Sequence, residues 1–487
     1  MPQLRDSSTS GASAQEPVSS AEMDGFCRIF GVETEYGVSL TGADRPVDAG
    51  QVAMTMFQPV VSRSRSTNTY LTNGSRLYLD VGSHPEYATA EARRPMDALA
   101  QDLAGERIMR RLALEAQERL RALLGGSVAV HVFKNNVDSA GHAFGCHENY
   151  LVRRFVPLEQ VEHELLPFLI TRQLFTGAGR VTDEGLQITQ RADFLDEAVS
   201  SATTRARPMV NTRDEPHADP DSFRRLHVII GDSNRSHWAT WMKLATTHLV
   251  LCVMEQAVRA GASSGFESMA LVDPAAANRA VSRYLFADDI VLDTVSGPMS
   301  PLAMQRRYLA IAESFANDHS AQVDGELGDG IAAQVLAQWH EALDLLEAEE
   351  YDMLADRVDW AAKRRLLHAL KARHPQISHA QLEQIELDYH DVANGKVYES
   401  LLSRGQMRAL VDSDTVARAV NDAPTDTRAA LRGAFVDAAV RSGAQFSCDW
   451  TRLVVSAPER HEVAIMDPFR AEPTQEFERL MRSLNVR

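Results

Sequence analysis

The sequence predicts an α+β protein with a small additional domain at its C-terminus. Hydrophobic residues make up 44% and charged residues 24% of the 487-residue chain, the composition of an ordinary globular protein. Strand-like segments dominate the first half of the chain, whereas helical periodicity dominates after Trp241. This length accommodates one to three domains, each with a large hydrophobic core.

Charge and cysteine usage exclude several classes of protein. The chain has 50 basic and 67 acidic residues, and its net charge of −17 disfavours nonspecific binding to nucleic acid or anionic lipid. No segment reaches the roughly 18 to 20 apolar residues that span a bilayer, and the Ser-rich N-terminus lacks the apolar centre of a signal peptide. The four cysteines lie far apart, which favours reduced thiols over a zinc site or disulfides. We therefore expect a cytoplasmic protein that binds neither nucleic acid nor membrane.

The first part of the chain predicts a tail, two strands and a long helix. Residues 1–25 are rich in Ser, Ala, Gly and Pro without hydrophobic periodicity, which is typical of a disordered tail. Residues 26–38 and 75–81 have the pattern of strands. A helix begins at Pro95 and ends at Gly125, because proline favours the first position of a helix and glycine the position after its end.

The rest of the sequence predicts more strands, then helices, then a domain boundary. Strands are expected at residues 127–133, 148–155, 186–190 and 226–231, and helices near residue 165 and at residues 243–260, 301–317, 330–349, 355–373 and 398–403. The Asn-Asp-Ala-Pro run at residues 421–424 marks a boundary. We expect a catalytic domain over residues 26–420 and a small C-terminal domain over residues 421–487, with a helix at residues 427–441 and strands at 450–456 and 463–466.

Two glutamates in the first strand are candidates for a metal site. Glu33 and Glu35 are two residues apart, so both side chains leave the same face of an extended strand. Their repulsion is best offset by a cation, and hard oxygen ligands suit Mg²⁺. An isolated pair of this kind is, however, more often a solvated strand face.

The second strand adds further chemistry. One of its faces is apolar, and the other carries Arg76, Tyr78 and Asp80. His84, Glu86 and Glu91 follow closely and could supply oxygen and nitrogen ligands. Two acidic strands beside a guanidinium predict a sheet that binds a nucleotide through metal ions.

Other motifs are less specific. The glycines around Ala178 lack the third glycine of a dinucleotide fingerprint and the Lys-Ser of a P-loop, and no nucleophile motif is present. Residues 134–138, 145–150 and 211–219 are dense in amide, acid and imidazole groups, which is typical either of binding loops or of turns. His227, in an apolar strand, is by itself more often a core histidine than a ligand.

The chain resembles the family of Pup ligases and Pup deamidases in the runs GVETEYG, NGSRLYLDVGSHPEYATAE, FKNNVDSAG, GCHENYL, SSATTRARPMVNTRDEPHAD and RRLHVIIGDSN. The similarity extends from about Arg28 to the C-terminus. It implies a curved antiparallel sheet backed by helices, similar to glutamine synthetase and the carboxylate-amine ligases, with a small C-terminal domain.

Three features favour the ligase over the deamidase within this family. The first strand reads Val-Glu-Thr-Glu, a short insertion separates Tyr36 from Leu71, and the second motif has the long form that ends at Glu91. The resemblance then implies a magnesium site, an ATP site and a catalytic base. The magnesium ligands would be Glu33, Tyr78 and Glu86, the ATP contacts Arg76, Thr89 and Trp450, and the base Asp80. Glu35, His147 and His227 would be further metal or phosphate neighbours.

The implied reaction joins the small protein modifier Pup to target proteins and marks them for proteasomal degradation. ATP would phosphorylate the side-chain carboxylate of the C-terminal glutamate of Pup, and a lysine amine of the target would displace phosphate. Pup is a disordered acidic chain, so it needs local basic groups, for which the candidates are Arg205/Arg207, Arg224/Arg225 and Arg306/Arg307, although ordinary solvated charge explains such pairs equally well.

Three alternatives stay open from the sequence. They are a Pup deamidase or depupylase, a small-molecule glutamate–amine ligase on the same fold, and a non-catalytic nucleotide-binding regulator of proteasomal delivery. A regulator would have no need of the base Asp80.

Overall fold

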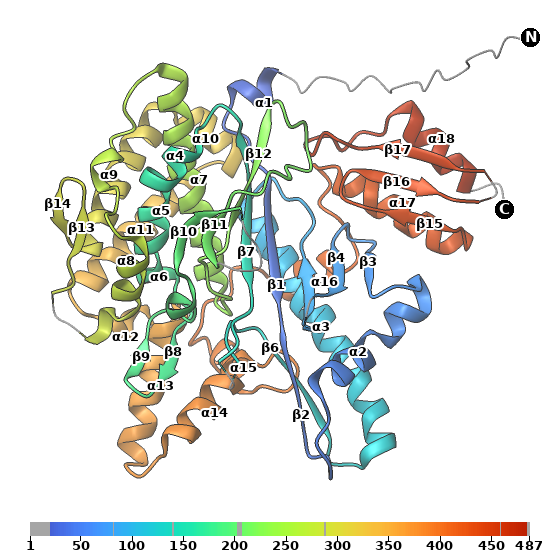
Figure 1. The fold of residues 1–487 in the computed structure, drawn as a ribbon, viewed down its shortest axis with the longest axis horizontal. Coiled ribbons are helices and arrows are strands. Elements are labelled where there is room, and N and C mark those ends of the chain that lie inside the picture. Colours follow the sequence, from blue (N-terminus) through green and yellow to red (C-terminus); the bar gives the residue numbers. More distant parts are fainter. Residues whose placement is uncertain are drawn as a thin grey trace, which may run out of the picture.

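The computed structural model describes residues 20–80, 82–138, 141–201, 207–286, 289–457 and 459–484 (Figure 1). An eight-stranded sheet lies at its centre. In spatial order its strands are β10 (Glu197–Ser200), β11 (Pro208–Asn211), β12 (Phe223–Val228), β7 (Cys146–Arg153), β1 (Phe30–Glu35), β5 (Pro85–Ala88), β4 (Arg76–Leu79) and β3 (Asn68–Tyr70). Neighbouring strands are antiparallel except β10 and β11, which are parallel.

The two faces of this sheet differ in chemistry. Phe30 and Val32 of β1 and Tyr150 of β7 point into the main hydrophobic core, where α3 (Pro95–Leu124) packs on β1 and α7 (His237–Ala260) packs on β7. Side chains alternate along a strand, so every second residue of β1, including Glu33 and Glu35, leaves the opposite face. Burial of the apolar face thus decides where the polar side chains point.

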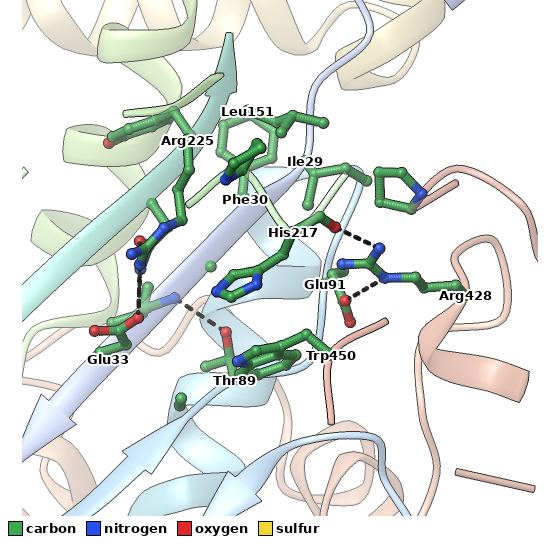
Figure 2. Close-up of a pocket in the computed structure, with 17 residues that line it drawn as sticks. Ile29, Phe30, Glu33, Thr89, Glu91, Leu151, His217, Arg225, Arg428 and Trp450 are labelled. Carbon is green, nitrogen blue, oxygen red and sulfur yellow. Dashed lines mark hydrogen bonds and ion pairs between the residues drawn. The ribbon is translucent and has the colours of Figure 1, made fainter. Parts of the chain in front are cut away.

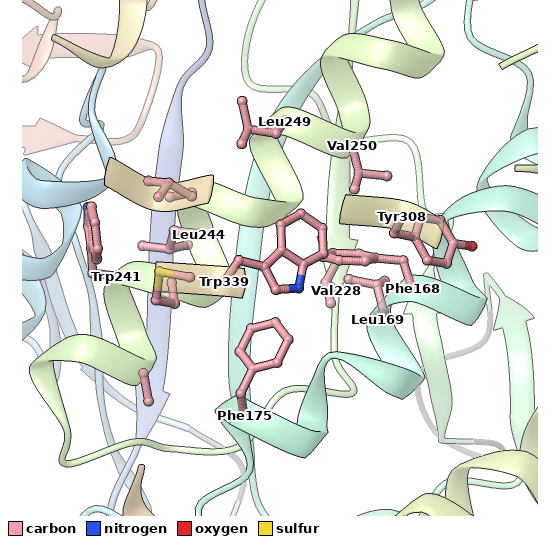
Figure 3. Close-up of a cluster of buried hydrophobic side chains, with 14 of the residues drawn as sticks. Phe168, Leu169, Phe175, Val228, Trp241, Leu244, Leu249, Val250, Tyr308 and Trp339 are labelled. Carbon is pink, nitrogen blue, oxygen red and sulfur yellow. The ribbon is translucent and has the colours of Figure 1, made fainter. Parts of the chain in front are cut away.

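Helix α16 (Ser413–Ala419) packs against α3. Other helices that follow β7 cover one side of the sheet, drawn from teal through green and yellow to orange in Figure 1. They include α5 (Leu166–Thr171), α8 (Pro274–Ser282), α9 (Pro301–Asp318), α10 (Ser320–Leu327), α11 (Ile331–Glu347), α13 (Asp359–Arg373), α14 (His379–His390) and α15 (Val397–Ser403). Trp339 lies among Phe168, Phe175 and Tyr308 in their shared core (Figure 3). The helices predicted here from periodicity are confirmed, with ends that differ by a few residues.

The segment predicted to form a small domain, residues 421–487, is called the small domain below. Its described residues contain α17 (Ala429–Ser442), the antiparallel strands β15 (Phe446–Cys448), β16 (Arg452–Val455) and β17 (His461–Ala464), and α18 (Gln475–Leu484). Phe435, Leu453 and Leu480 belong to its hydrophobic core, which Tyr70 of β3 also enters. The small domain, red in Figure 1, therefore packs against the β3 edge of the main sheet. The strand β15 and the helix α18 were not predicted.

The predicted fold class, an antiparallel sheet backed by helices, is confirmed, but the first strand is shorter than predicted. Strand β1 ends at Glu35, and β2 (Gly37–Thr41) leaves the sheet to pair with β6 (Ala129–Phe133). Between them, the fully buried Tyr36 donates its backbone N–H to the carbonyl of Pro85 (2.9 Å). Similarly, the strand predicted at residues 186–190 is β9 (Gly185–Gln187), which forms a separate two-stranded sheet with β8 (Arg180–Thr182).

A helix that the sequence analysis missed lies between the first two predicted strands. Helix α2 (Ala49–Ser64) begins after Asp48, whose side chain accepts a hydrogen bond from the N–H of Gly50. Val52, Met56 and Phe57 face the core. Its exposed Ser, Thr and Arg residues and the internal Pro59 concealed this periodicity.

The prediction of a disordered tail is wrong at its C-terminal end, and residues 1–19 lie outside the described residues. Residues Ser20–Asp24 form the short helix α1. Arg153 donates to the carbonyls of Glu22 (2.7 Å) and Gly25 (2.9 Å), and Arg259 also donates to Gly25 (2.8 Å). The segment is held because it satisfies buried guanidinium groups.

All four cysteines are free thiols, as predicted. Within the described residues, no helix combines the length and the apolar character that crossing a membrane requires.

Glu255 on α7 is expected to be important for stability. Its carboxylate lies 2.9 Å from Arg28 and 3.0 Å from Arg153, and all three side chains are fully buried. The substitution Glu255→Gln leaves two buried guanidinium groups without an anion, so the free energy of unfolding should fall by about 3 kcal/mol. Urea denaturation would measure this. As a control, Glu118→Gln removes an exposed partner of Arg121 and should change the free energy by less than about 1 kcal/mol; equal losses in both variants would contradict the account.

Candidate active site

The polar face of the sheet brings together acidic residues that are distant in sequence. Glu33 on β1 lies opposite His147 on β7, and Glu35 lies opposite Glu86 on β5. Glu86 in turn lies opposite Tyr78 on β4. The residues predicted as ligands from two separate motifs therefore occupy one face of four neighbouring strands.

These side chains form two clusters that could each hold a metal ion. In each cluster the candidate ligand atoms lie within 4.8 Å of one another. The first cluster contains Glu33, His147 and His227, and the second contains Glu35, Asp80 and Glu86. Carboxylate oxygens are the ligands that Mg²⁺ prefers, and imidazole nitrogens widen the choice of metal at the first cluster. The predicted ligands Glu33 and Glu86 thus lie in different clusters.

Hydrogen-bond donors surround Glu33 in the first cluster. His147 Nδ1 and Asn149 Nδ2 both lie 3.2 Å from its oxygens, and Arg225 Nη1 lies at 3.5 Å. Burial by itself would raise the pKa of Glu33, but the hydrogen bond from His147 and the nearby His227 and Arg225 hold that pKa well below its usual range. Glu33 is therefore a carboxylate at neutral pH and available as a ligand.

His227 has the properties of a metal ligand. Burial, together with His147 and Arg225, lowers the pKa of His227 to about 3, so its imidazole is neutral. Its Nε2 atom is buried and has no hydrogen-bond partner among the described residues. A buried nitrogen with a free position, directed at a carboxylate 3.7 Å away, fits a site for a cation. This geometry therefore favours a ligand role for His227 over the interpretation as a core histidine.

Negative charge accumulates in the second cluster. Glu86 is buried, and burial together with the charges of Glu33 and Glu35 raises its pKa well above the usual range. The hydroxyl of Tyr78 donates a hydrogen bond to Glu86, and burial together with the Glu86 charge raises the pKa of Tyr78. Since these carboxylates repel one another, a divalent cation is the natural counter-charge, and the residues present fit Mg²⁺.

Asp80 is directed into the second cluster by a tight turn after β4. Its backbone N–H donates to the carbonyl of His84 (3.0 Å), and its carbonyl accepts from the N–H of Ser83 (2.9 Å). Gly82 and Ser83 adopt left-handed backbone conformations, with φ of 93° and 65°. The turn fixes the Asp80 carboxylate beside those of Glu35 and Glu86.

A cavity of about 570 Å³ adjoins the first cluster (Figure 2). Ile29 and the first residues of β1, up to Glu33, line one side, and Thr89, just after β5, lines another. The small domain contributes Trp450 and Arg428. The cavity combines apolar walls with a few polar groups, as small-molecule sites do.

Two of the three predicted ATP contacts line this cavity. The Thr89 hydroxyl is held at its edge because it accepts the backbone N–H of Val32 (3.0 Å). Trp450 packs edge-to-face against Tyr70, with ring centroids 5.2 Å apart. Arg76 lies outside the cavity lining as the structure describes it; its guanidinium is 4.1 Å from the Tyr78 ring centroid, on the same sheet face.

Two residues that the sequence analysis offered as ligands have other roles. The carboxylate of Glu91 forms ion pairs with Arg428 and Arg432 of the small domain. The expectation that Glu91 serves as a metal ligand is therefore wrong. His84 stacks on Phe144, with ring centroids 4.9 Å apart. Neither residue belongs to the two clusters.

The three dense loop motifs also differ in role. Residues 145–150 fall largely in β7 and supply His147 and Asn149. Residues 211–219 supply His217, which lines the cavity and which the sequence analysis had considered only as part of this run. Lys134 is instead buried and forms ion pairs with Asp102 (2.6 Å) and Glu106 (2.8 Å). The segment 134–138 therefore contributes to packing.

Comparison with known proteins identifies the family. A model of the family described as Pup-ligase protein matches residues 28–454. The chain is 69% identical to the Pup–protein ligase of Bifidobacterium longum (strain DJO10A), over 100% of both chains. It is 62% identical to the Pup–protein ligase of Bifidobacterium dentium, over 99% of this chain and 100% of that protein.

Two solved structures have the same fold. The ligase PafA in its crystal complex with the prokaryotic ubiquitin-like protein Pup superposes with a TM-score of 0.86 and 36% identity, covering 95% of this chain and 92% of that chain. PafA in complex with ADP gives a TM-score of 0.79 and 37% identity, covering 92% and 96%. The paired strands with their acidic face, the adjoining cavity and these full-length similarities show that the chain belongs to the Pup-ligase family.

Proposed function

We propose that the polar face of the sheet catalyses ATP-dependent ligation of Pup to lysine side chains of target proteins. The observation that carries this proposal is the position of both acidic clusters on one sheet face, next to a cavity of about 570 Å³. The cavity would hold the nucleotide between Thr89 and Trp450, with its phosphates directed toward Glu33. The solved relatives bind ADP in one case and Pup in another, which supports both ligands here.

Magnesium would be bound by Glu33, Tyr78 and Glu86, with Glu35, His147 and His227 as further neighbours. The two clusters support this set, and Tyr78 would contribute a neutral hydroxyl oxygen, since it is protonated and hydrogen-bonded to Glu86. When bound there, Mg²⁺ would neutralise charge on the β- and γ-phosphates.

The reaction takes place in two steps. In the first, the side-chain carboxylate of the C-terminal glutamate of Pup attacks the γ-phosphorus of ATP, which yields an acyl phosphate and ADP. Arg225, with Nη1 3.5 Å from Glu33, and Arg76 on the same face would stabilise the negative oxygens. Phosphorylation gives the carboxyl carbon a leaving group that a free carboxylate lacks.

In the second step, a lysine amine attacks the acyl carbon and inorganic phosphate departs with the bonding electron pair. The amine must lose a proton, since an unperturbed lysine has a pKa near 10.4 and arrives as ammonium. We assign Asp80 as the base, because the turn after β4 fixes its carboxylate on the reacting face. The product is an isopeptide bond.

Pup is acidic in this family, so its binding requires basic groups on this acidic chain. Of the arginine pairs considered from the sequence, Arg225 belongs to the active site, and Arg306 is neutralised by Asp344 (2.5 Å) and Glu347 (2.8 Å). Arg205 lies outside the described residues. We also infer that the enzyme works in the cytoplasm, where its ATP is made.

The Pup deamidase is the nearest alternative function, because it would use the same aspartate and nucleotide. The ligase is favoured by the first-strand motif, by the short insertion, and by the full-length similarity to Pup–protein ligases from two Bifidobacterium species. Activity with free glutamate would instead indicate a small-molecule ligase.

Replacing the base should abolish ligation without abolishing nucleotide binding. The variant Asp80→Asn retains the shape of the side chain but cannot accept the lysine proton, so the ligation rate should fall by at least about 100-fold. Intact-protein mass spectrometry would measure conjugate formation, and calorimetry would measure ADP affinity in the presence of Mg²⁺. The exposed Asp293 on β13 (Leu292–Thr294), which does not line the cavity, provides the control Asp293→Asn, which should ligate normally. Ligation by the Asp80 variant at the wild-type rate would exclude Asp80 as the base.

Trp450 should contribute to nucleotide affinity. The variant Trp450→Ala removes an aromatic wall of the cavity, and because base stacking is typically worth about 1–3 kcal/mol, the Kd for ADP should rise about tenfold or more. Trp450→Phe retains a ring and should show a smaller loss. An unchanged Kd in the alanine variant would place the nucleotide elsewhere.

A further inference from the structure

The cavity is enclosed by segments that are far apart in the sequence, and the Glu91 carboxylate lies where they meet. Glu91 follows β5 and is nearly fully buried. Its Oε1 atom accepts from Arg428 Nε (2.8 Å) and Arg432 Nη1 (3.1 Å), and its Oε2 atom pairs with Arg432 Nη2. Thr427 also donates its hydroxyl to the Glu91 carbonyl (3.0 Å). One carboxylate thus joins the main sheet to the start of α17.

Each of the two arginines also reaches a wall of the cavity. Arg428 Nη1 donates to the carbonyl of His217 (2.5 Å) and to that of Met466 (3.0 Å), and Figure 2 shows it between Glu91 and His217. Arg432 Nη1 donates to the carbonyl of Trp450 (3.2 Å), and its guanidinium lies 4.8 Å from the centroid of that indole ring. His217 and Trp450 are therefore positioned through the same carboxylate.

His217 and Trp450 form neighbouring aromatic surfaces of the cavity. Their ring centroids are 6.3 Å apart, with planes inclined by 40°. His217 has a left-handed backbone with φ of 52°, which a non-glycine residue adopts only when its surroundings impose it. The hydrogen bond from Arg428 to its carbonyl is such a constraint. Burial and the neighbouring Arg225 and Arg428 lower the pKa of His217 to about 4, so it presents a neutral ring.

We propose that Glu91 is a positioning residue for the nucleotide: through Arg428 and Arg432 it fixes His217 and Trp450, and so sets the affinity for ATP. This inference rests on the proposed location of ATP in the cavity. Glu91 does not take part in phosphoryl transfer or in attack by lysine, since its two oxygens are occupied by the arginines.

The chain contains a matched group against which this role can be tested. Glu255 also joins two buried arginines, Arg28 and Arg153, at distances of 2.9 Å and 3.0 Å. That network borders the core and α1 and contributes no residue to the cavity lining. A purely structural role for Glu91 predicts that both carboxylates behave alike when replaced, whereas a positioning role predicts that only Glu91 affects the nucleotide.

The test compares Glu91→Gln, Arg428→Lys and Glu255→Gln in the full-length enzyme. For Glu91→Gln we expect the Kd for ADP, measured by calorimetry, and the KM for ATP to rise on the order of tenfold. The KM for Pup and the kcat at saturating ATP should change less than about twofold. Arg428→Lys keeps the charge but loses the branched contacts to the His217 and Met466 carbonyls, so it should weaken ADP binding in the same direction. Glu255→Gln should lower the melting temperature but leave both nucleotide constants unchanged.

Each outcome decides the proposal. Wild-type ADP affinity in a folded Glu91→Gln variant overturns it, as does an equal change of nucleotide affinity in Glu255→Gln. If Glu91→Gln does not fold, Arg428→Lys decides, and wild-type affinity in that variant overturns the proposal. The Trp450→Ala variant separates this inference from the proposed function: if it too binds ADP normally, the nucleotide does not occupy this cavity. If only Trp450→Ala weakens binding, the location of ATP stands and the role of Glu91 fails.

Discussion

The constraint on which the structure depends is electrostatic: several carboxylates share one face of a sheet, where they repel one another. Donors from His147, Asn149 and Arg225 keep Glu33 ionised, while burial and the neighbouring acids raise the pKa of Glu86. The pKa of Glu33 is lowered and that of Glu86 is raised, so the protein's own groups compensate the negative charge of these carboxylates only in part. A divalent cation would supply the remaining positive charge.

Strand β1 contributes to both the hydrophobic core and this site, because its side chains point alternately to the two faces of the sheet. Phe30 and Val32 lie in the main core, and Glu33 and Glu35 face the site. Helices α3 and α7 cover the apolar face, so only the opposite face is open to ligands. The small domain then completes the cavity with Trp450. The proposed binding of the nucleotide there would depend on contacts between the small domain and the main sheet.

Local patterns predicted much of this arrangement. The two-residue spacing of Glu33 and Glu35, and the alternation around Asp80, indicated a shared polar face, which the structure contains. The ATP contacts predicted for Thr89 and Trp450 came only from the family resemblance, since neither residue has a local signal. The break at Tyr36, the docking of the small domain through Glu91 and the ligand-like position of His227 all depend on long-range contacts. Such contacts leave no periodicity in the sequence. Helix α2 does have helical periodicity, but the polar residues on its exposed face concealed it.

The central claim is that this face activates the C-terminal glutamate of Pup and transfers it to an amine. The most direct test is intact-protein mass spectrometry of the enzyme mixed with ATP, Mg²⁺, a lysine-bearing acceptor, and Pup ending in either glutamate or glutamine. We expect the glutamate form to join the acceptor with loss of one water and the glutamine form to stay unchanged. A gain of about one dalton by the glutamine form without any conjugate, the mass change of an amide hydrolysed to an acid, would contradict the account and identify a deamidase.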